Sequence, residues 1–299
     1  MKTAIAALAV MAVAGAAPLM ARQAGFSAGE SGFSSQVRAG FLAAGRQAGL
    51  FRAAARKASA ERRVNALVQY AADGNLPMVK ALLAQGVDVN AKSDYGPAAL
   101  SAAAVNNRAE VVRYLLDRGA DPNAAARHPS PGYYGDASGV APLMLIASNR
   151  IFDVRMAFDL LAHGAAVDAR DSLGDTALMY AAQGGAVSAP DAGSHLDLIK
   201  LLLAHHADVN ARNKPGLTAL MWVAAASGFA GASSSALASQ RIGIARYLIA
   251  AGADVNAVNA AGASALNLAE GPSCVKSPMT ELIAAHGGKR GSAVSACKN

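Results

Sequence analysis

The chain has 299 residues, of which 53% are hydrophobic, so it carries enough apolar surface for one or two ordinary domains or one elongated array. This composition argues against a wholly disordered chain. The formal net charge of +7 arises within residues 1–63, where nine Lys and Arg face two Glu, whereas residues 64–299 hold 18 basic and 18 acidic residues. The main part is therefore neutral, and no nucleic-acid partner is expected.

The first residues have the pattern of an export signal. Lys2 precedes a run of small and apolar residues, 3–17, which is too short to span a membrane stably. We predict a signal peptide over residues 1–21, cleaved after Ala16 or after Ala21, with a buried first helix as the alternative. The mature protein is then expected in the periplasm, or otherwise secreted. It has no predicted transmembrane span, because no later run reaches about 18 apolar residues.

Residues 22–60 form a basic leader. Phe33, Val37 and Phe41 fall at helical spacing with Arg residues among them. The leader is either mobile and partly helical, or an amphipathic helix that caps the following part or makes weak contact with an anionic membrane. Residues 25–29 match the Gly-x-Ser-x-Gly nucleophile motif, but that motif needs a strand before the Ser and a helix after it. We therefore assign no catalytic site there.

Two landmarks recur after residue 60. The first is a tripeptide of the Thr-Ala-Leu kind, and the second is a Gly-Ala-Asp-x-Asn turn that follows an apolar run of helical spacing. The tripeptides end at Leu67, Leu100, Leu143, Leu178, Leu220 and Leu266. The turns begin at Gly86, Gly119, Gly164, His206 and Gly252.

These landmarks resemble the ankyrin repeat, whose unit is a β-turn finger followed by two antiparallel helices. The resemblance spans residues 61–290. It implies an all-α solenoid of about six repeats, the last one a cap, in a protein similar to the exported bacterial type. Thr176, Thr218 and Ser264 are expected to cap first helices, and His206 to take the left-handed conformation that Gly takes in other turns.

One family feature is missing. The His that usually follows the tripeptide does not occur, so its hydrogen bonds must be absent or replaced. Its places hold Val68, Ser101, Met144, Met179, Met221 and Asn267.

The repeats differ in length. Successive tripeptide Leu residues lie 33, 43, 35, 42 and 46 residues apart, against a usual period of about 33. The first excess falls in a finger, within residues 128–139, and the two larger later ones fall between paired helices, near 185–194 and 227–240. Tyr133 and Tyr134 lie on the first excursion and suit a partner contact, because Tyr is common at interface hot spots. Packing of both rings back onto the solenoid is the alternative.

The resemblance implies binding of another protein through the fingers and the first helices. The candidate contacts on the fingers are Lys92, Asp94, Tyr95, Tyr133, Tyr134, Arg170, Asp171, Arg212, Asn213, Lys214 and Asn259. Those on the first helices are Asp73, Asn106, Asn149 and Gln183.

We predict no enzyme activity, metal or cofactor, because no nucleophile, acid–base pair or metal-ligand set has a recognisable spacing. His163, His205 and His286 hold equivalent places in different repeats, and a helix spacing of about 8–10 Å keeps them from sharing one metal. Each is expected to complement a helix C-terminus. Tyr180 and Trp222 occupy equivalent places on first helices, where packing between repeats accounts for them.

Cys274 and Cys297 are the only cysteines. In an oxidising compartment they favour a disulfide that joins the tail, residues 291–299, to the last repeat. Such a closure would stabilise the fold by about 3 kcal/mol. Two free thiols are the alternative.

Overall fold

The computed structural model describes residues 56–93, 96–127, 138–149, 152–187, 194–228, 235–271 and 276–292. The chain divides into two compact units, Met1–Arg63 and Val64–Asn299. Of the first unit only residues 56–63 are described, and they are helical. The predicted signal peptide, most of the leader and both cysteines lie outside the described residues. None of the helices in the described ranges is long and apolar enough to cross a membrane.

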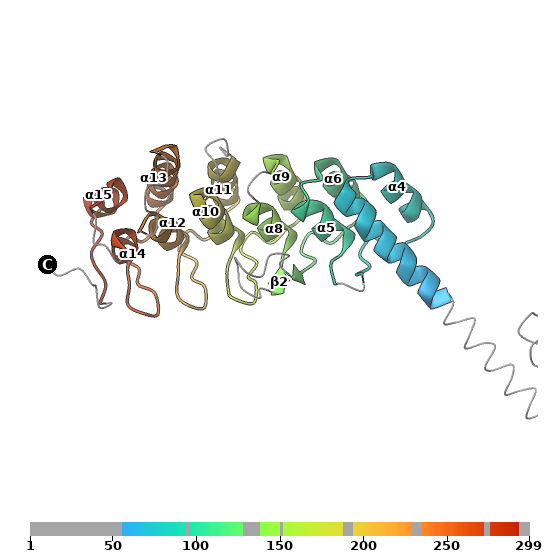
Figure 1. Ribbon diagram of the computed structural model, residues 1–299, viewed down its shortest axis with the longest axis horizontal. Coiled ribbons are helices and arrows are strands. Elements are labelled where there is room, and N and C mark those ends of the chain that lie inside the picture. The colour runs from blue at the N-terminus through green and yellow to red at the C-terminus, as the bar shows by residue number, and fades with distance from the viewer. Residues whose placement is uncertain are drawn as a thin grey trace, which may run out of the picture. The chain divides into compact units, whose positions relative to one another are not determined.

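The second unit is a row of helix pairs. The inner helices are residues 64–73, α5 (Ala99–Val105), α8 (Pro142–Ser148), α10 (Ala177–Val187), α12 (Ala219–Gly228) and α14 (Ala265–Glu270). The outer helices are α4 (Leu76–Ala84), α6 (Ala109–Asp117), α9 (Val154–Ala162), α11 (Ser194–Ala204), α13 (Ser235–Ala250) and α15 (Pro278–Ala285). Figure 1 shows the inner helices α5, α8, α10, α12 and α14 in one layer, the outer helices in a second layer, and loops projecting beyond the inner layer. The predicted all-α repeat architecture is confirmed.

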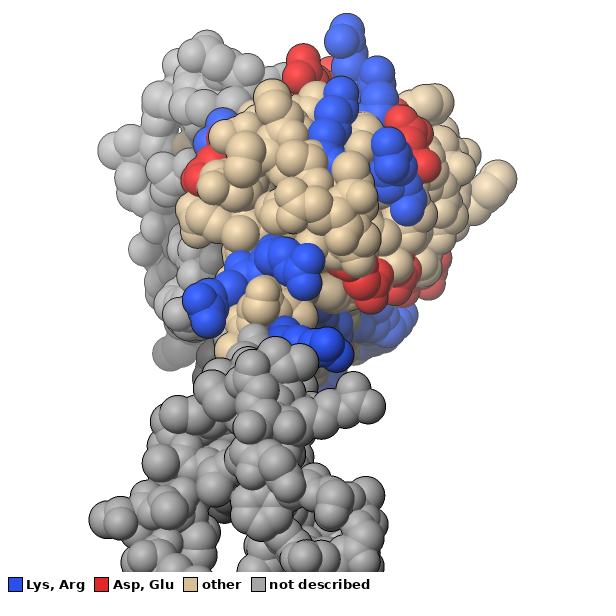
Figure 2. Space-filling view, turned by 90° about the vertical axis from the view of Figure 1, so that its right-hand side faces the viewer, with Lys and Arg blue, Asp and Glu red and all other residues tan. Residues whose placement is uncertain are grey.

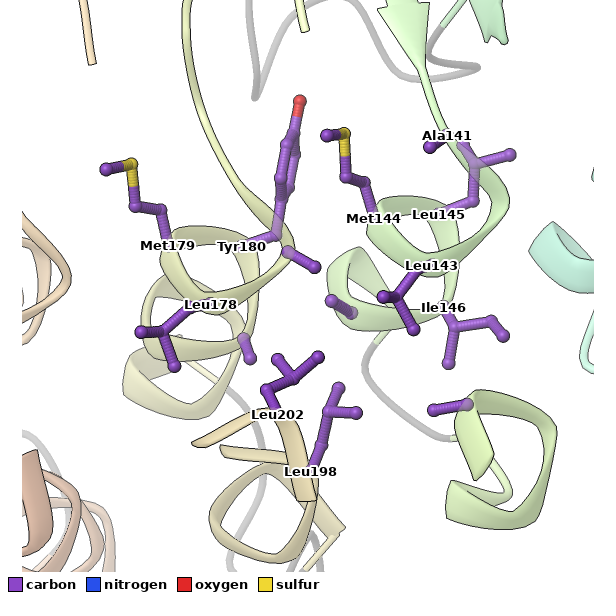
Figure 3. Packing of buried hydrophobic residues seen from close by; sticks show 14 of the residues in the cluster. Ala141, Leu143, Met144, Leu145, Ile146, Leu178, Met179, Tyr180, Leu198 and Leu202 are labelled. Carbon is purple, nitrogen blue, oxygen red and sulfur yellow. The ribbon is translucent and has the colours of Figure 1, made fainter. Parts of the chain in front are cut away.

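The core fills the space between the helix layers. Leu198 and Leu202 are fully buried and point from α11 toward the gap between α8 and α10 (Figure 3). Their spacing of four residues places them on one face of the helix. Burial of each such side chain contributes about 1.5–3 kcal/mol. Because these leucines reach two neighbouring inner helices, one repeat depends on the next for its core.

Side-chain hydrogen bonds join successive turns into a ladder. Asn90 Nδ2 donates to the Gly119 carbonyl at 3.1 Å, and the Asp121 amide donates to Asn90 Oδ1 at 2.7 Å. The same two bonds recur at Asn123, Asn210 and Asn256. Asp168 takes this place in the third repeat, where its carboxylate accepts from the Asp208 amide at 3.0 Å and has no proton to donate. The ladder explains why the sequence repeats this Asn.

The outer helices end in left-handed residues, as the sequence predicts. Gly86 and Gly119 have φ of 79° and 82°, and His206 takes φ of 65° at the equivalent place. The His206 amide still donates to the Leu203 carbonyl at 3.0 Å, so the turn keeps its hydrogen bond without Gly.

The inner helices begin with the predicted caps. Met179 N lies 3.4 Å from Thr176 Oγ1, and Ser264 forms a capping box with Asn267. Asn267 stands at one place of the missing His, so here a polar side chain replaces its bonding. Met144, Met179 and Met221 fill three equivalent places and are buried, so there the hydrogen bonds are replaced by apolar packing.

The fingers hold little sheet. β1 (Ala126–Arg127) and β2 (Ser138–Val140) pair antiparallel at the base of the long third finger. Part of the extra length of the fourth and fifth repeats is helical, because α10 continues to Val187 and α13 begins at Ser235. The middle of each long segment lies outside the described residues.

Candidate functional site

Three successive fingers are described without a gap, and we call them the finger row. They are residues 169–175, 211–217 and 257–263. Lys214 N donates to the Leu173 carbonyl at 2.9 Å, and Ala260 N donates to the Pro215 carbonyl at 2.8 Å. Each finger is thereby held against the next one.

Glycine at the finger tips permits this close approach. Gly216 has φ of 80°, and a Cβ atom added to it would lie 3.0 Å from Ala260 N. Gly174 has φ of 81° and a similar distance, 3.1 Å, to Lys214 N. Both positions therefore require Gly for backbone conformation and for space.

Two guanidinium groups add further links. Arg170 Nη1 donates to the Arg212 carbonyl at 2.6 Å and to the Gly174 carbonyl at 3.3 Å. Arg212 Nη2 donates to the Val258 carbonyl of the next finger. Because a guanidinium has five N–H donors, both Arg side chains keep donors for other contacts. Both residues are also exposed.

Asp171 and Asn213 organise their own fingers. Asp171 is 7% exposed and accepts from the Leu173 and Asp175 amides, each at 2.8 Å. Asn213 is likewise 7% exposed, and it accepts from the Leu217 amide at 2.7 Å. Both were candidate contacts in the sequence, but their polar atoms are engaged inside the fold. We leave them out of the proposed contact surface.

A buried polar network lies behind the finger row. Tyr180 Oη donates to Asp171 Oδ2 at 2.8 Å, and Asn213 Nδ2 donates to Asp175 Oδ1 at 2.8 Å. Burial raises the pKa of Asp175, and the neighbouring Asp171 carboxylate raises it further, against hydrogen bonds from Asn213 and Trp222. Tyr180 and Trp222 thus stabilise the repeats, as their equivalent places in the sequence indicate.

The other finger candidates divide into two groups. Lys92 and Lys214 are exposed, and Asn259 is half-buried with its Oδ1 accepting from two amides of its own finger. Asp94, Tyr95, Tyr133 and Tyr134 lie outside the described residues.

The candidates on the inner helices stand near the helix C-termini. Asp73 accepts from Gln69 at 3.0 Å, and Asn106 Nδ2 donates to the Ala102 carbonyl at 2.8 Å. Asn149 Nδ2 donates to the Val105 carbonyl of the preceding repeat at 3.0 Å. Gln183 is half-buried.

A shallow hollow of about 600 Å³ lies on the other side of the repeats, across α4, α6 and α9. Leu76 and Tyr114 line it together with charged residues that include Arg113, Arg155 and Asp159. Arg113 Nε pairs with Asp159 Oδ2 at 3.1 Å. The hollow is thus lined by charges of both signs, and Arg113 and Asp159 already form an ion pair there.

His163 and His286 lie at helix C-termini. His163 Nδ1 lies 2.7 Å from the Asp159 carbonyl and His286 Nδ1 lies 2.9 Å from the Leu282 carbonyl, as expected for residues at helix C-termini. The described residues contain no group of three or more His, Cys, Asp or Glu side chains that could hold a metal ion.

His195 lies outside both repeat landmarks, so the sequence alone does not indicate its role. It is fully buried in α11, with its ring 4.9 Å from that of Phe152 in an edge-to-face arrangement. Gly184 of α10 makes room for it, since a Cβ there would lie 2.6 Å from His195 Nε2. Burial lowers the pKa of His195 to about 4, although the backbone carbonyls of Asn149 and Ala147 favour its protonated form.

Two curated proteins are similar to parts of the chain. The mitochondrial disaggregase of Homo sapiens is 48% identical over 58 residues, which cover 19% of this chain and 8% of that protein. The mitochondrial disaggregase of Bos taurus is 32% identical over 143 residues, which cover 40% of this chain and 21% of that protein. The chain thus spans less than a quarter of the length of these relatives.

Family models match most of the repeat row. A model of three ankyrin repeats matches residues 42–126, and a model of the single ankyrin repeat matches residues 173–214 and 216–260. Together these matches cover more than half of the 299 residues. The unmatched residues between them include the long third finger, yet α8 and α9 continue the row of helix pairs there. The chain belongs to the ankyrin-repeat family.

Proposed function

We propose that the chain binds another protein through the finger row and the adjoining inner helices. One observation carries this proposal: the finger row is tied from finger to finger by backbone and guanidinium hydrogen bonds, while it leaves Arg170, Arg212 and Lys214 exposed. A surface that is already ordered loses little conformational entropy when a partner docks. A preorganised row of exposed side chains therefore suits recognition.

A photo-crosslinking experiment tests this face. A benzophenone amino acid replaces Ala261, which is exposed on a finger, or Ala284, which is exposed on α15. Each full-length variant is irradiated with extract from the native source. We expect a discrete crosslinked protein from position 261 and none from position 284. Equal crosslinking from both positions, or crosslinks from α15 alone, would contradict the proposal.

The third finger is a second part of the proposed contact surface. Tyr133 and Tyr134 lie outside the described residues, and their assignment rests on the sequence. Replacement of both by Ala should weaken partner capture at least about tenfold, as loss of an aromatic hot spot does. Unchanged capture would mean that these tyrosines do not contact the partner.

The likeness to mitochondrial disaggregases supports a shared repeat segment. The similar segment covers at most 21% of those proteins, so we propose that this chain binds a partner protein and we propose no disaggregase activity for it. We also propose no other catalytic role.

The leader suggests a second role. Its basic residues favour contact with an anionic membrane surface. We also propose that the protein is exported and that its last repeat is a cap. Binding to vesicles that contain anionic lipid should then fall with added salt and disappear when residues 22–60 are deleted. Vesicle binding that survives the deletion would exclude this role for the leader.

A further inference from the structure

The finger row carries positive charge without exposed negative charge. Arg170, Arg212 and Lys214 are exposed, whereas the only carboxylates of its three fingers, Asp171 and Asp175, are 7% and 9% exposed. Both carboxylates accept hydrogen bonds from within the fold, so their oxygens are not exposed to a docking ligand. The exposed surface of the row is therefore basic.

The opposite charges lie elsewhere in the described repeats. Exposed carboxylates occur mainly on the turns and outer helices, at Asp88, Asp121, Asp168, Asp208, Asp254, Glu110, Asp117, Asp197 and Glu281, and one, Asp73, ends the first inner helix. Figure 2 looks along the row from its α4 end, and it shows acidic and basic side chains interspersed at the upper edge, where the outer helices lie. The turns and outer helices thus expose charges of both signs, whereas the exposed charged side chains of the finger row are all basic.

Apolar side chains accompany the cations of the finger row. Leu173 and Val258 are each 37% exposed, on the first and the last of the three fingers. Large apolar side chains placed beside cations suit a ligand that has both negative and apolar groups. A peptide provides both, whereas single-stranded nucleic acid is usually held by stacked aromatic rings, which the three fingers lack.

We propose that the finger row docks an extended acidic segment of the partner protein, which rests on the function proposed above. Stacked repeats lie about 10 Å apart. An extended chain in the polyproline II conformation rises about 3.1 Å per residue with about three residues per turn, so every third side chain points to the same side and faces the next finger. Carboxylates at that spacing meet the cations of neighbouring fingers, and apolar residues between them contact Leu173 and Val258. Specificity then comes from the match between acidic spacing and finger spacing.

A peptide-binding assay tests the acidic partner. The probe is a fluorescent 12-residue peptide with Glu at every third position and Leu and Ala between, titrated with the full chain and followed by anisotropy. We expect saturable binding that Lys214→Glu weakens about tenfold, because an attraction becomes a repulsion. Arg246→Glu, on an exposed residue of α13, makes the same change in net charge and should weaken binding less than about twofold.

Other outcomes would overturn the proposal. One is that Lys214→Glu and Arg246→Glu weaken peptide binding equally, and another is equal affinity for a peptide with Lys in place of Glu. A third is that a 12-nucleotide RNA or anionic vesicles bind in preference to the peptide, through Lys214. The crosslinking experiment distinguishes failure of the acidic-ligand proposal from failure of protein binding by the fingers. A partner crosslinked at position 261 through a segment without acidic residues would overturn the acidic ligand and leave protein binding by the fingers standing.

Discussion

Gly216 lies where two fingers nearly touch, and Gly86 has the same backbone conformation in open space. Their φ values are 80° and 79°, but a Cβ at Gly86 would meet no atom within 4 Å. Gly86→Ala should therefore lower the free energy of unfolding by about 1–2 kcal/mol, which is the cost of holding an L-residue in the left-handed conformation. Gly216→Ala should cost at least about 1 kcal/mol more, because the added carbon presses on the next finger. Urea unfolding measures both losses, and equal values would show that the fingers yield freely.

Asp168 weakens the ladder that Asn residues build elsewhere. Asp168→Asn restores a donor that can reach the His206 carbonyl, as Asn210 reaches that of Gly252 at 3.0 Å. We expect a gain of about 1 kcal/mol in the free energy of unfolding. The reverse change, Asn210→Asp, removes the same donor and should cost a similar amount. A gain from both substitutions would contradict this account of the ladder.

Some residue roles could be predicted from the sequence and others could not. The repeated Asn and the left-handed His206 follow from the landmarks, because every repeat solves the same backbone problem. Asp171 and Asn213 are polar finger residues, and only their hydrogen bonds to later amides show that they face inward. Asp and Asn commonly close turns in this way, so the sequence is also compatible with an inward role for both residues. His195 carries no local signal, because its burial arises from the packing of two repeats.

The fingers act as elements through their links. Arg212→Met removes the bond to the Val258 carbonyl and leaves the packing of the helices unchanged. We expect faster hydrogen exchange at the amides of residues 257–263, with little change in global stability. Lys214→Met, at an exposed residue that makes its link through the backbone amide, is the matched control and should leave exchange in that finger unchanged. Slower or unaltered exchange in the Arg212 variant would exclude the link.

The long segments between paired helices could be located from repeat spacing, but their conformation could not. Residues 233–239 are rich in Ser and Ala, which is compatible with a solvated linker or with an extension of the following helix, and α13 begins at Ser235. Ala favours helix and Ser favours it less, so intrinsic preference alone does not fix where α13 begins. Packing against neighbouring helices decides its first residue.

At the scale of the whole repeat row, His195 makes stability depend on pH. Its pKa is about 4 in the folded chain and 6.5 in a free side chain, so between these values the unfolded chain binds more protons. Stability from this site is complete above pH 6.5 and is lost as the pH falls toward 4. Between pH 7 and pH 5 the loss should be about 2 kcal/mol.

Chemical denaturation of His195→Leu at both pH values checks this. The variant should lose most of the difference, whereas His205→Leu, at an exposed residue that follows α11, should keep it. A pH dependence that is the same in wild type and His195→Leu would place its origin elsewhere.

The Asp168 substitution also sets where the row can bend. Between the third and fourth repeats the turn edge lacks the hydrogen bond that Asn would donate, while the finger edge keeps the hydrogen bond from the Ser172 amide to the Ser138 carbonyl, at 2.8 Å. Neighbouring repeats interact only pairwise, so compliance collects at the weakest contact. Under tension or thermal agitation, we expect this junction to open like a hinge along its finger side. The finger row would then move as a rigid unit together with the C-terminal repeats. Its distance from the fingers of the first repeats would vary as the junction opens and closes.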